Sequence, residues 1–228
     1  MSRFKFIAVA AVLVGAYALA LAACGGDDDD NGGSSTSGGS SGGGGGGSIA
    51  LLLPESKTAR YESQDRPNFE KKVKELCSDC DIIYSNADQD ASKQQQQAEA
   101  AITKGAKVLV LDPVDAASAG AIVNRAKQSQ IPVISYDRLI TDADIDYYIS
   151  FDNEKVGKLQ GDALVKKLKD DGKSGSIVII NGAPTDNNAK LFKQGAHSVI
   201  DSSGFKVAKE YDTPDWSPDK AQQEMEQA

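Results

Sequence analysis

The chain is poor in the side chains on which most enzymes and metal sites depend. Its 228 residues include one histidine, His197, three cysteines and one tryptophan. No second pair of metal ligands accompanies Cys77 and Cys80, as a structural zinc site would require. No G-x-S-x-G motif marks a nucleophile, and no G-x-G-x-x-G motif follows the first apolar segment of the body. We therefore expect no enzymatic activity, no metal and no cofactor, and we expect His197 to be a packing or surface residue.

Basic charge is also scarce. The chain has 25 Lys and Arg residues against 33 Asp and Glu residues, for a formal net charge of −8. It has no basic tract and no interleaving of basic and aromatic residues, so nucleic acid is not an expected partner. The sequence GKS at 172–174 lacks the upstream glycine of a phosphate loop and precedes a strand instead of following one.

Long hydrophobic runs are absent beyond the first residues. The run from Ile7 to Leu21 is shorter than the ~20 residues that cross a bilayer. It follows Arg3 and Lys5, which is typical of a secretory signal. The segment ends in small residues and Cys24, and resembles a bacterial lipobox, in which this cysteine is acylated. Residues 1–24 thus predict a lipoprotein signal peptide, with an ordinary signal peptide as the alternative. We expect a lipid-anchored protein on the extracytoplasmic face of the membrane.

Residues 25–48 contain only glycine, serine, threonine, asparagine and aspartate. Such a segment cannot bury enough apolar surface to offset its ordering entropy, so we expect a disordered linker. The aspartates at 27–30 are consecutive and lack the alternating spacing of a calcium loop.

Cys77 and Cys80 are spaced C-x-x-C at the end of a predicted helix. Outside the cytoplasm an even pair favours a disulfide. Free thiols and, less favourably, a redox-active pair or half of a zinc site are the alternatives.

From Ile49 onward, short apolar segments alternate with segments of helical period. Continuous apolar strands separated by helices predict right-handed βαβ units and a parallel sheet, and so an α/β fold with parallel sheets flanked by helices. Gly105 is a plausible helix stop, and Asp90 and Asp115 are plausible helix N-caps. The expected strands are 49–53, 81–85, 106–112, 131–136, 147–151, 176–181 and 205–211.

One connection, between 136 and 147, holds about ten polar residues and no helix. We interpret it as the first crossing between two lobes, which divides the body into a first lobe, 49–150, and a second, 151–228. A helix that starts with Ser217 and Pro218 is followed by no further strand. Two strands are too few to bury the faces of a lobe. We therefore expect the second lobe to be incomplete and the chain to be truncated at its C-terminus.

Polar residues cluster after the expected strands, where ligands of open parallel sheets bind. Carboxylates accept hydrogen bonds from sugar hydroxyls, while guanidinium and amide groups donate to them. This mixture, with one or two aromatic residues, is typical of a polyol site, although several of the residues also suit helix caps. The residues are Glu55, Lys57, Arg60, Tyr61, Asn86, Asp88, Asp90, Asp112, Asp115, Asp137, Arg138, Asp152, Asn153, Asp186, Asn187, Asn188, Asp212, Asp215 and Trp216.

Three stretches, 136–160, 184–197 and 215–228, resemble the D-xylose-binding proteins, sugar receptors of ABC transporters with the type I periplasmic-binding fold. The resemblance implies two α/β lobes that close on a pyranose. The loop 54–61 departs from the pattern of that family, which leaves the identity of the sugar open. The ligand-binding residues that the resemblance implies are Arg60, Tyr61, Asp137, Arg138, Asn187, Asn188 and Trp216.

The function implied by this resemblance is that of an extracytoplasmic receptor for D-xylose or a related aldose. The receptor would be monomeric, would bind by lobe closure, and would deliver its monosaccharide to an ABC permease. The alternative is a sugar sensor that acts on a chemoreceptor or histidine kinase. Because of the expected truncation, we expect the 228-residue chain itself to bind weakly or not at all.

Overall fold

The computed structural model of the chain describes residues 46–228. These residues all belong to one of the two compact units of the chain. The expected signal peptide, its Cys24 and the linker up to residue 45 lie outside the described residues. Between residues 46 and 228, no helix has both the length and the apolar character needed to cross a membrane.

The first sheet has five strands, and all of its neighbouring strands run parallel. Its order, β2-β1-β3-β4-β5, requires a crossover between successive strands. The apolar runs that predicted these strands form the core, and Leu51, Leu52 and Leu53 are at most 2% exposed. The α/β prediction with parallel sheets is therefore confirmed. The strands are β1 (Ser48–Leu53), β2 (Asp81–Asn86), β3 (Ala106–Leu111), β4 (Val133–Tyr136) and β5 (Tyr147–Ile149).

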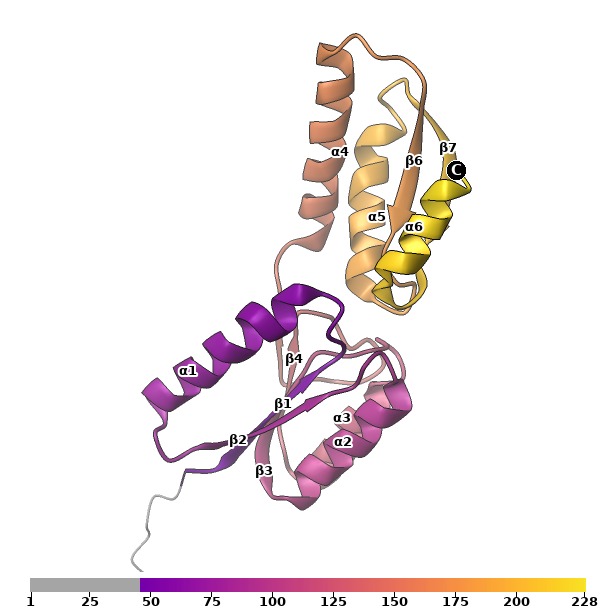
Figure 1. Cartoon of the computed structure of the whole chain (residues 1–228). Helices are drawn as coiled ribbons and strands as arrows, with labels where there is room; N and C mark the ends of the chain where they lie inside the picture. The colour runs from indigo at the N-terminus through magenta and orange to yellow at the C-terminus, as the bar shows by residue number, and fades with distance from the viewer. Residues whose placement is uncertain (1–45) are drawn as a thin grey trace, which may run out of the picture. The chain divides into compact units, whose positions relative to one another are not determined.

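Helices cover both faces of this sheet (Figure 1). On one face, Phe69 of α1 packs against a core cluster that includes Leu51 and Val110. On the other face, residues of α2 and α3, such as Ala98 and Ile122, pack against the opposite side chains of the same strands. The alternation of side chains along β1 and β3 thus supplies both cores. The helices are η1 (Tyr61–Asp65), which leads into α1 (Arg66–Leu76), α2 (Ala91–Thr103) and α3 (Gly120–Gln128).

The remaining elements contain a second sheet, in which β6 and β7 run parallel. Helices α4 and α5 pack on it through Val165 and Ile200. The two helices approach each other closely at glycines. A Cβ added to Gly157 would lie only 2.0 Å from the carbonyl oxygen of Phe192. The elements are α4 (Asn153–Asp170), β6 (Ser176–Asn181), α5 (Asn187–Ile200), β7 (Lys206–Asp212), η2 (Pro214–Trp216) and α6 (Pro218–Glu226).

The structure corrects three details of the sequence interpretation. Strand β5 pairs with β4, so the chain leaves the first sheet after Ile149 and not in the aspartate-rich loop. Ser48, placed in the linker, is the first residue of β1. Asp115 is not a helix N-cap: it accepts hydrogen bonds from backbone N–H groups in a turn before α3. By contrast, Asp90 caps α2 by accepting from the backbone N–H of Lys93, as predicted.

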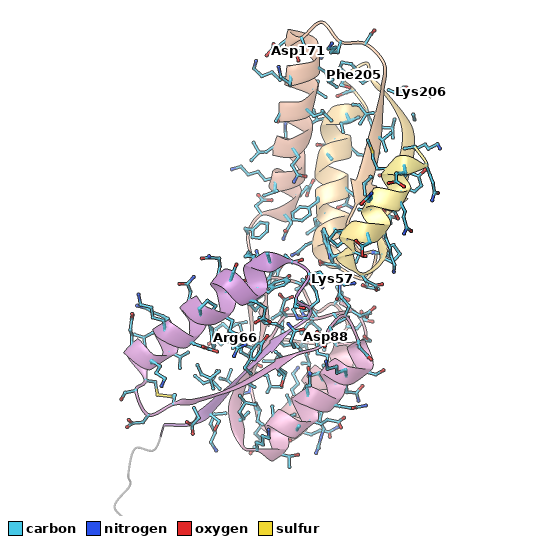
Figure 2. The ribbon with its side chains drawn as sticks, viewed as in Figure 1. Lys57, Arg66, Asp88, Asp171, Phe205 and Lys206 are labelled. Carbon is cyan, nitrogen blue, oxygen red and sulfur yellow. A yellow bond between two sulfur atoms is a disulfide. The ribbon has the colours of Figure 1, made fainter. Side chains whose placement is uncertain are left out.

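Cys77 and Cys80 form a disulfide between the end of α1 and the start of β2 (Figure 2). The bridge lies at the amino end of β2, on the opposite edge of the sheet from the carboxyl ends of the strands. Residue Leu76, just before the bridge, is 77% exposed, so this leucine lies outside the core.

Candidate functional site

The loops at the carboxyl ends of the strands enclose a cavity of about 220 Å³. This volume is below the roughly 300–1,000 Å³ of pockets for drug-sized ligands, so the cavity suits a smaller molecule. Charged, amide and aromatic side chains line it together. The lining residues are Thr58, Arg60, Tyr61, Asp137, Arg138, Phe151, Asp186, Asn188, Phe192 and Trp216.

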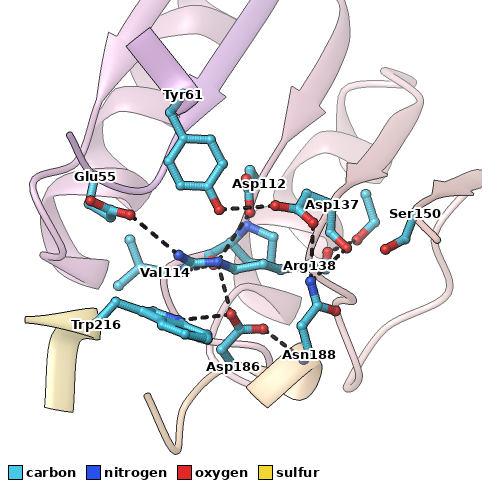
Figure 3. Close-up of polar contacts among 12 residues, drawn as sticks. Glu55, Tyr61, Asp112, Val114, Asp137, Arg138, Ser150, Asp186, Asn188 and Trp216 are labelled. Carbon is cyan, nitrogen blue, oxygen red and sulfur yellow. Dashed lines mark hydrogen bonds and ion pairs between the residues drawn. The ribbon is translucent and has the colours of Figure 1, made fainter. Parts of the chain in front are cut away.

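Asp137 forms several of the polar contacts of this cavity (Figure 3). It directly follows β4, and its φ of 58° places it in the left-handed region, which aspartate tolerates better than most residues. Its Oδ2 accepts hydrogen bonds from the guanidinium of Arg60 and, at 3.0 Å, from the hydroxyl of Tyr61. Its Oδ1 accepts a hydrogen bond of 3.1 Å from the side-chain amide of Asn188. Asp137 therefore connects the loop after β1 to the start of α5.

Arg138 is 2% exposed and lies among three carboxylates (Figure 3). Its Nε is 3.1 Å from Oδ2 of Asp186 and 3.6 Å from Oδ1 of Asp112. A terminal nitrogen is 3.7 Å from Oε1 of Glu55. The guanidinium also lies over the ring of Tyr61, 5.7 Å from its centroid. Ion pairs around a buried arginine with this geometry hold the side chain in one place, and Arg138 lines the cavity there.

Asp186 precedes α5 and links Arg138 to the aromatic wall of the cavity. Its Oδ1 accepts from the backbone N–H of Asn188 at 2.8 Å, which makes it the N-cap of the helix. Its Oδ2 accepts from the indole Nε1 of Trp216 at 3.0 Å. Phe151 and Phe192 stack with centroids 6.2 Å apart. The cavity thus combines polar groups with apolar ring surface, as polyol binding requires.

Two buried polar residues that do not line the cavity fix the loops behind it. Ser135 donates from its hydroxyl to the carbonyl of Arg138 at 2.7 Å and accepts from the backbone N–H of Ile140 at 3.1 Å. Gln94 of α2 donates to the carbonyl of Asp112 and accepts from the backbone N–H of Val114. These bonds hold the turns after β3 and β4, which carry Asp112 and Arg138.

Burial controls the protonation of the site. Burial raises the pKa of Asp112 well above its usual value, although Arg138 opposes this rise. Burial also raises the pKa of Asp186, again against the effect of Arg138. Burial alone would lower the pKa of Arg138, but the charges of Asp112 and Asp186 raise it above its ordinary value. Arg138 therefore stays charged, while the buried carboxyls bind protons more readily than exposed ones.

The structure brings six of the seven predicted ligand residues to the cavity: Arg60, Tyr61, Asp137, Arg138, Asn188 and Trp216. Asn187 does not line it, so its role in binding stays a prediction. Asp186, which was noted after the sixth strand, also lines the cavity, as do Thr58, Phe151 and Phe192. Phe151 and Phe192 carried no sequence signal, because one belonged to an apparent strand and the other to the apolar face of a helix.

His197 lies in α5 and does not line the cavity. Its two ring nitrogens are each 2.9 Å from a carboxylate oxygen, one of Asp201 and one of Glu210. The prediction of a packing or surface residue is confirmed. Among residues 46–228, no group of three or more His, Cys, Asp or Glu side chains could hold a metal ion.

A cavity at the carboxyl ends of parallel strands is the usual place of the ligand site in open α/β sheets. A family model described as periplasmic binding protein domain matches residues 49–228. The chain therefore belongs to the periplasmic binding protein domain family. The members of this family are binding proteins.

Individual relatives are similar over most of the chain. The D-xylose-binding periplasmic protein of Escherichia coli K12 is 39% identical over 184 residues, which cover 79% of this chain and 54% of the relative. The chain thus spans about half the length of this relative.

Solved structures of sugar-binding proteins are also similar to this chain. An ABC transporter solute-binding protein from Clostridium phytofermentans with bound β-D-glucose has a TM-score of 0.70 and 32% identity, over 79% of this chain and 59% of that one. The fructose-binding periplasmic domain of a hybrid two-component system has a TM-score of 0.70 and 25% identity, over 79% of this chain and 58% of that one.

Proposed function

We propose that this chain is the binding component of an extracytoplasmic receptor for D-xylose or a related aldose, which delivers its sugar to an ABC permease. One observation carries the proposal: six of the seven residues expected to contact sugar line a single cavity. The E. coli relative is a D-xylose-binding protein, and the C. phytofermentans relative holds bound β-D-glucose, which supports a monosaccharide as ligand.

The chemistry of the cavity supports the same ligand class. Arg60 and Arg138 can donate to hydroxyl oxygens, and the carboxylates of Asp137 and Asp186 can accept from hydroxyl hydrogens. Trp216 offers a flat apolar ring to the C–H face of a pyranose. Hydrogen bonds that involve a charged group contribute roughly 1.5–3 kcal/mol each, so a few of them suffice for a small polar ligand.

The mechanism that we propose is binding without chemistry. The cavity is lined from both sheets, because Asp137 and Arg138 follow β4 whereas Asp186 and Asn188 lie between β6 and β7. A sugar that contacts residues from both sides stabilises the arrangement in which they are close. The closed receptor would then dock on a permease, and acylated Cys24 with its linker would keep it at the membrane.

A sensing role is the second candidate. It is favoured by the similarity to the periplasmic domain of a hybrid two-component system. Deletion of the gene separates the two: loss of sugar uptake supports transport, and loss of a sugar-induced transcriptional response with normal uptake supports sensing.

Calorimetry and ligand-observed NMR with a panel of aldoses test the proposed function. The sequence predicted weak or no binding by this chain. Since the cavity is lined from both sheets, we expect millimolar or tighter binding of at least one aldose. The neighbouring residues Asn187 and Asn188 provide a matched pair. Asn188→Ala should weaken binding at least about tenfold, because the amide that reaches Asp137 is lost, and Asn187→Ala should have a smaller effect. No binding of any aldose at millimolar concentration would refute the proposal.

A further inference from the structure

The carboxylate of Glu62 belongs to a residue that directly follows two residues of the cavity wall, but it does not line the cavity itself. Arg60 and Tyr61 line the cavity from the start of η1. Glu62 is the second residue of η1 and instead contacts β2, an edge strand of the first sheet. Direct contact with a sugar therefore does not explain the role of Glu62.

Two donors from β2 converge on one oxygen of Glu62. The hydroxyl of Tyr84 donates to Oε1, and the side-chain amide of Asn86 donates to the same oxygen at 2.9 Å. The other oxygen, Oε2, lies 3.4 Å from a terminal nitrogen of Arg66, and the guanidinium of Arg66 lies over the ring of Tyr84, 3.7 Å from its centroid. Burial alone would raise the pKa of Glu62, but these hydrogen bonds lower it below its ordinary value. The carboxylate is therefore ionised at neutral pH, and its hydrogen bonds are charge-assisted.

The backbone that carries Arg60 and Tyr61 has an uncommon conformation. η1 is a π-helical turn, which is rare and is frequently found at functional sites. On the cavity side of this turn, Arg60 and Tyr61 both donate hydrogen bonds to Asp137, the residue after β4. On the other side, Glu62 accepts hydrogen bonds from β2. The turn is thus held between the ends of two strands, and loss of the Glu62 carboxylate would release it from β2.

We propose that Glu62 is a positioning residue of the ligand site. Its bonds to β2 fix η1 and so preset the side chains of Arg60 and Tyr61 for a sugar. This inference rests on the proposed function and adds a residue that acts on binding without touching the ligand. Side chains that are already ordered do not have to be immobilised when the ligand binds. If two side chains had to be ordered on binding instead, the affinity would fall by at least about fivefold.

Glu62 and Glu70 provide a matched pair of variants. Both carboxylates pair with Arg66 from four positions away, and their side chains are 35% and 38% exposed. Of the two, Glu62 is the one that also bonds to β2. In calorimetry with the aldose that binds best, Glu62→Ala should weaken binding at least about fivefold, and Glu70→Ala should leave the affinity unchanged. Wild-type affinity in Glu62→Ala, or equal losses in the two variants, would overturn the inference.

Glu62→Gln separates positioning from a general effect of charge. Glutamine keeps an acceptor oxygen for the donors of Tyr84 and Asn86 but removes the negative charge. It should therefore recover most of the affinity that is lost in Glu62→Ala. If Glu62 acted on the cavity only through its charge, Glu62→Gln would bind as weakly as Glu62→Ala, and that result would overturn the positioning role.

Hydrogen exchange follows the anchoring of η1 without any sugar. The backbone N–H of Tyr61 donates to the carbonyl of Thr58 at 3.1 Å, and the backbone N–H of Arg66 donates to the carbonyl of Tyr61. Both amides should exchange faster in Glu62→Ala than in wild type, whereas Glu70→Ala should leave the exchange of the Tyr61 amide unchanged. Unchanged exchange of both amides in Glu62→Ala would overturn the anchoring.

The two proposals fail in different ways. A wild-type chain that binds an aldose, together with a Glu62→Ala variant that binds it equally well, refutes the role of Glu62 and leaves the proposed function standing. If no aldose binds to the wild-type chain, the proposed function fails and the positioning role fails with it.

Discussion

Replacement of Arg138 by methionine should strongly destabilise the chain at neutral pH. The guanidinium is 2% exposed and has the carboxylates of Glu55, Asp112 and Asp186 within 3.7 Å. Removing one partner of a buried ion pair typically costs about 3–5 kcal/mol, because the other charge is left uncompensated. Methionine keeps the length and much of the packing of the arginine stem, so the expected loss of 3–5 kcal/mol in the free energy of unfolding reports mainly on charge.

The pH dependence of this loss separates the electrostatic explanation from a packing defect. Without Arg138, the pKa values of Asp112 and Asp186, already raised by burial, rise further. A carboxyl whose folded pKa exceeds its unfolded pKa destabilises the fold above the folded value. That penalty disappears as the pH falls toward the unfolded value near 3.8. The difference between wild type and Arg138→Met should therefore be largest near pH 8 and shrink toward pH 5.

Urea denaturation followed by circular dichroism at pH 8, 7, 6 and 5 measures this difference. Arg66→Met is the control, since Arg66 pairs with Glu62 and Glu70 at the surface and should cost about 1 kcal/mol or less. Arg138→Lys keeps the charge and should recover part of the stability. A loss below about 1 kcal/mol in Arg138→Met, or a loss that is independent of pH, would refute the reasoning.

Three further predictions concern the framework of the site. Gly157→Ala should lower the free energy of unfolding by about 1–3 kcal/mol, since its Cβ would lie 2.0 Å from the carbonyl oxygen of Phe192; melting curves that match wild type would contradict the close approach of α4 and α5. Gln94→Leu should lower the free energy of unfolding by about 1–3 kcal/mol for each backbone group of the loop after β3 that it leaves unpaired. Hydrogen exchange should then show faster exchange of the amides in that loop. The hydrogen bonds that the ring of His197 donates to the carboxylates of Glu210 and Asp201 raise the pKa of His197. The stability that His197 contributes should therefore be present below about pH 6.5 and lost as the pH rises through the folded pKa; an NMR pH titration giving an unshifted histidine would contradict this.

The arrangement of the first sheet could be predicted because its strands are apolar on both faces. Leu51, Leu52 and Leu53 in sequence require a strand covered on each side, which a parallel sheet with helices provides. The aspartate-rich loop was harder to interpret. β5 is only three residues long, and its side chains are exposed, so neither its length nor its burial distinguished it from a crossing segment. The crossing was therefore placed in the loop before β5, whereas the chain leaves the sheet after this strand.

The polar part of the site could also be predicted, because parallel strands bring their carboxyl ends to one edge. This rule included Asp137, Arg138 and Asn188 in a longer list of polar residues after the strands, and the family resemblance then singled them out. What it could not supply is which polar residues contact one another. Asp112 and Glu55 are separated by 57 positions yet both approach Arg138. The register of β1, β3 and β4 brings these two carboxylates to the same guanidinium group.

The aromatic part of the site was only partly predictable. Trp216 follows a strand and was expected at the cavity, whereas Phe151 and Phe192 were not. Phe192 lies one turn into α5, on a face whose neighbours are apolar, and its spacing is that of a core residue. Its position at the cavity depends on its stacking with Phe151, which is a tertiary contact without a local signature.

The central claim, that this cavity holds a sugar, is tested most directly by the indole N–H resonance of Trp216. The chain has one tryptophan, so one indole resonance reports on the cavity, where Nε1 donates to Asp186. In a titration with D-xylose and D-glucose, we predict a saturable shift of this resonance for at least one of the two sugars, and a weaker shift in Asn188→Ala. An indole resonance that stays fixed while other resonances shift, or that does not respond to either sugar at millimolar concentration, would contradict the account.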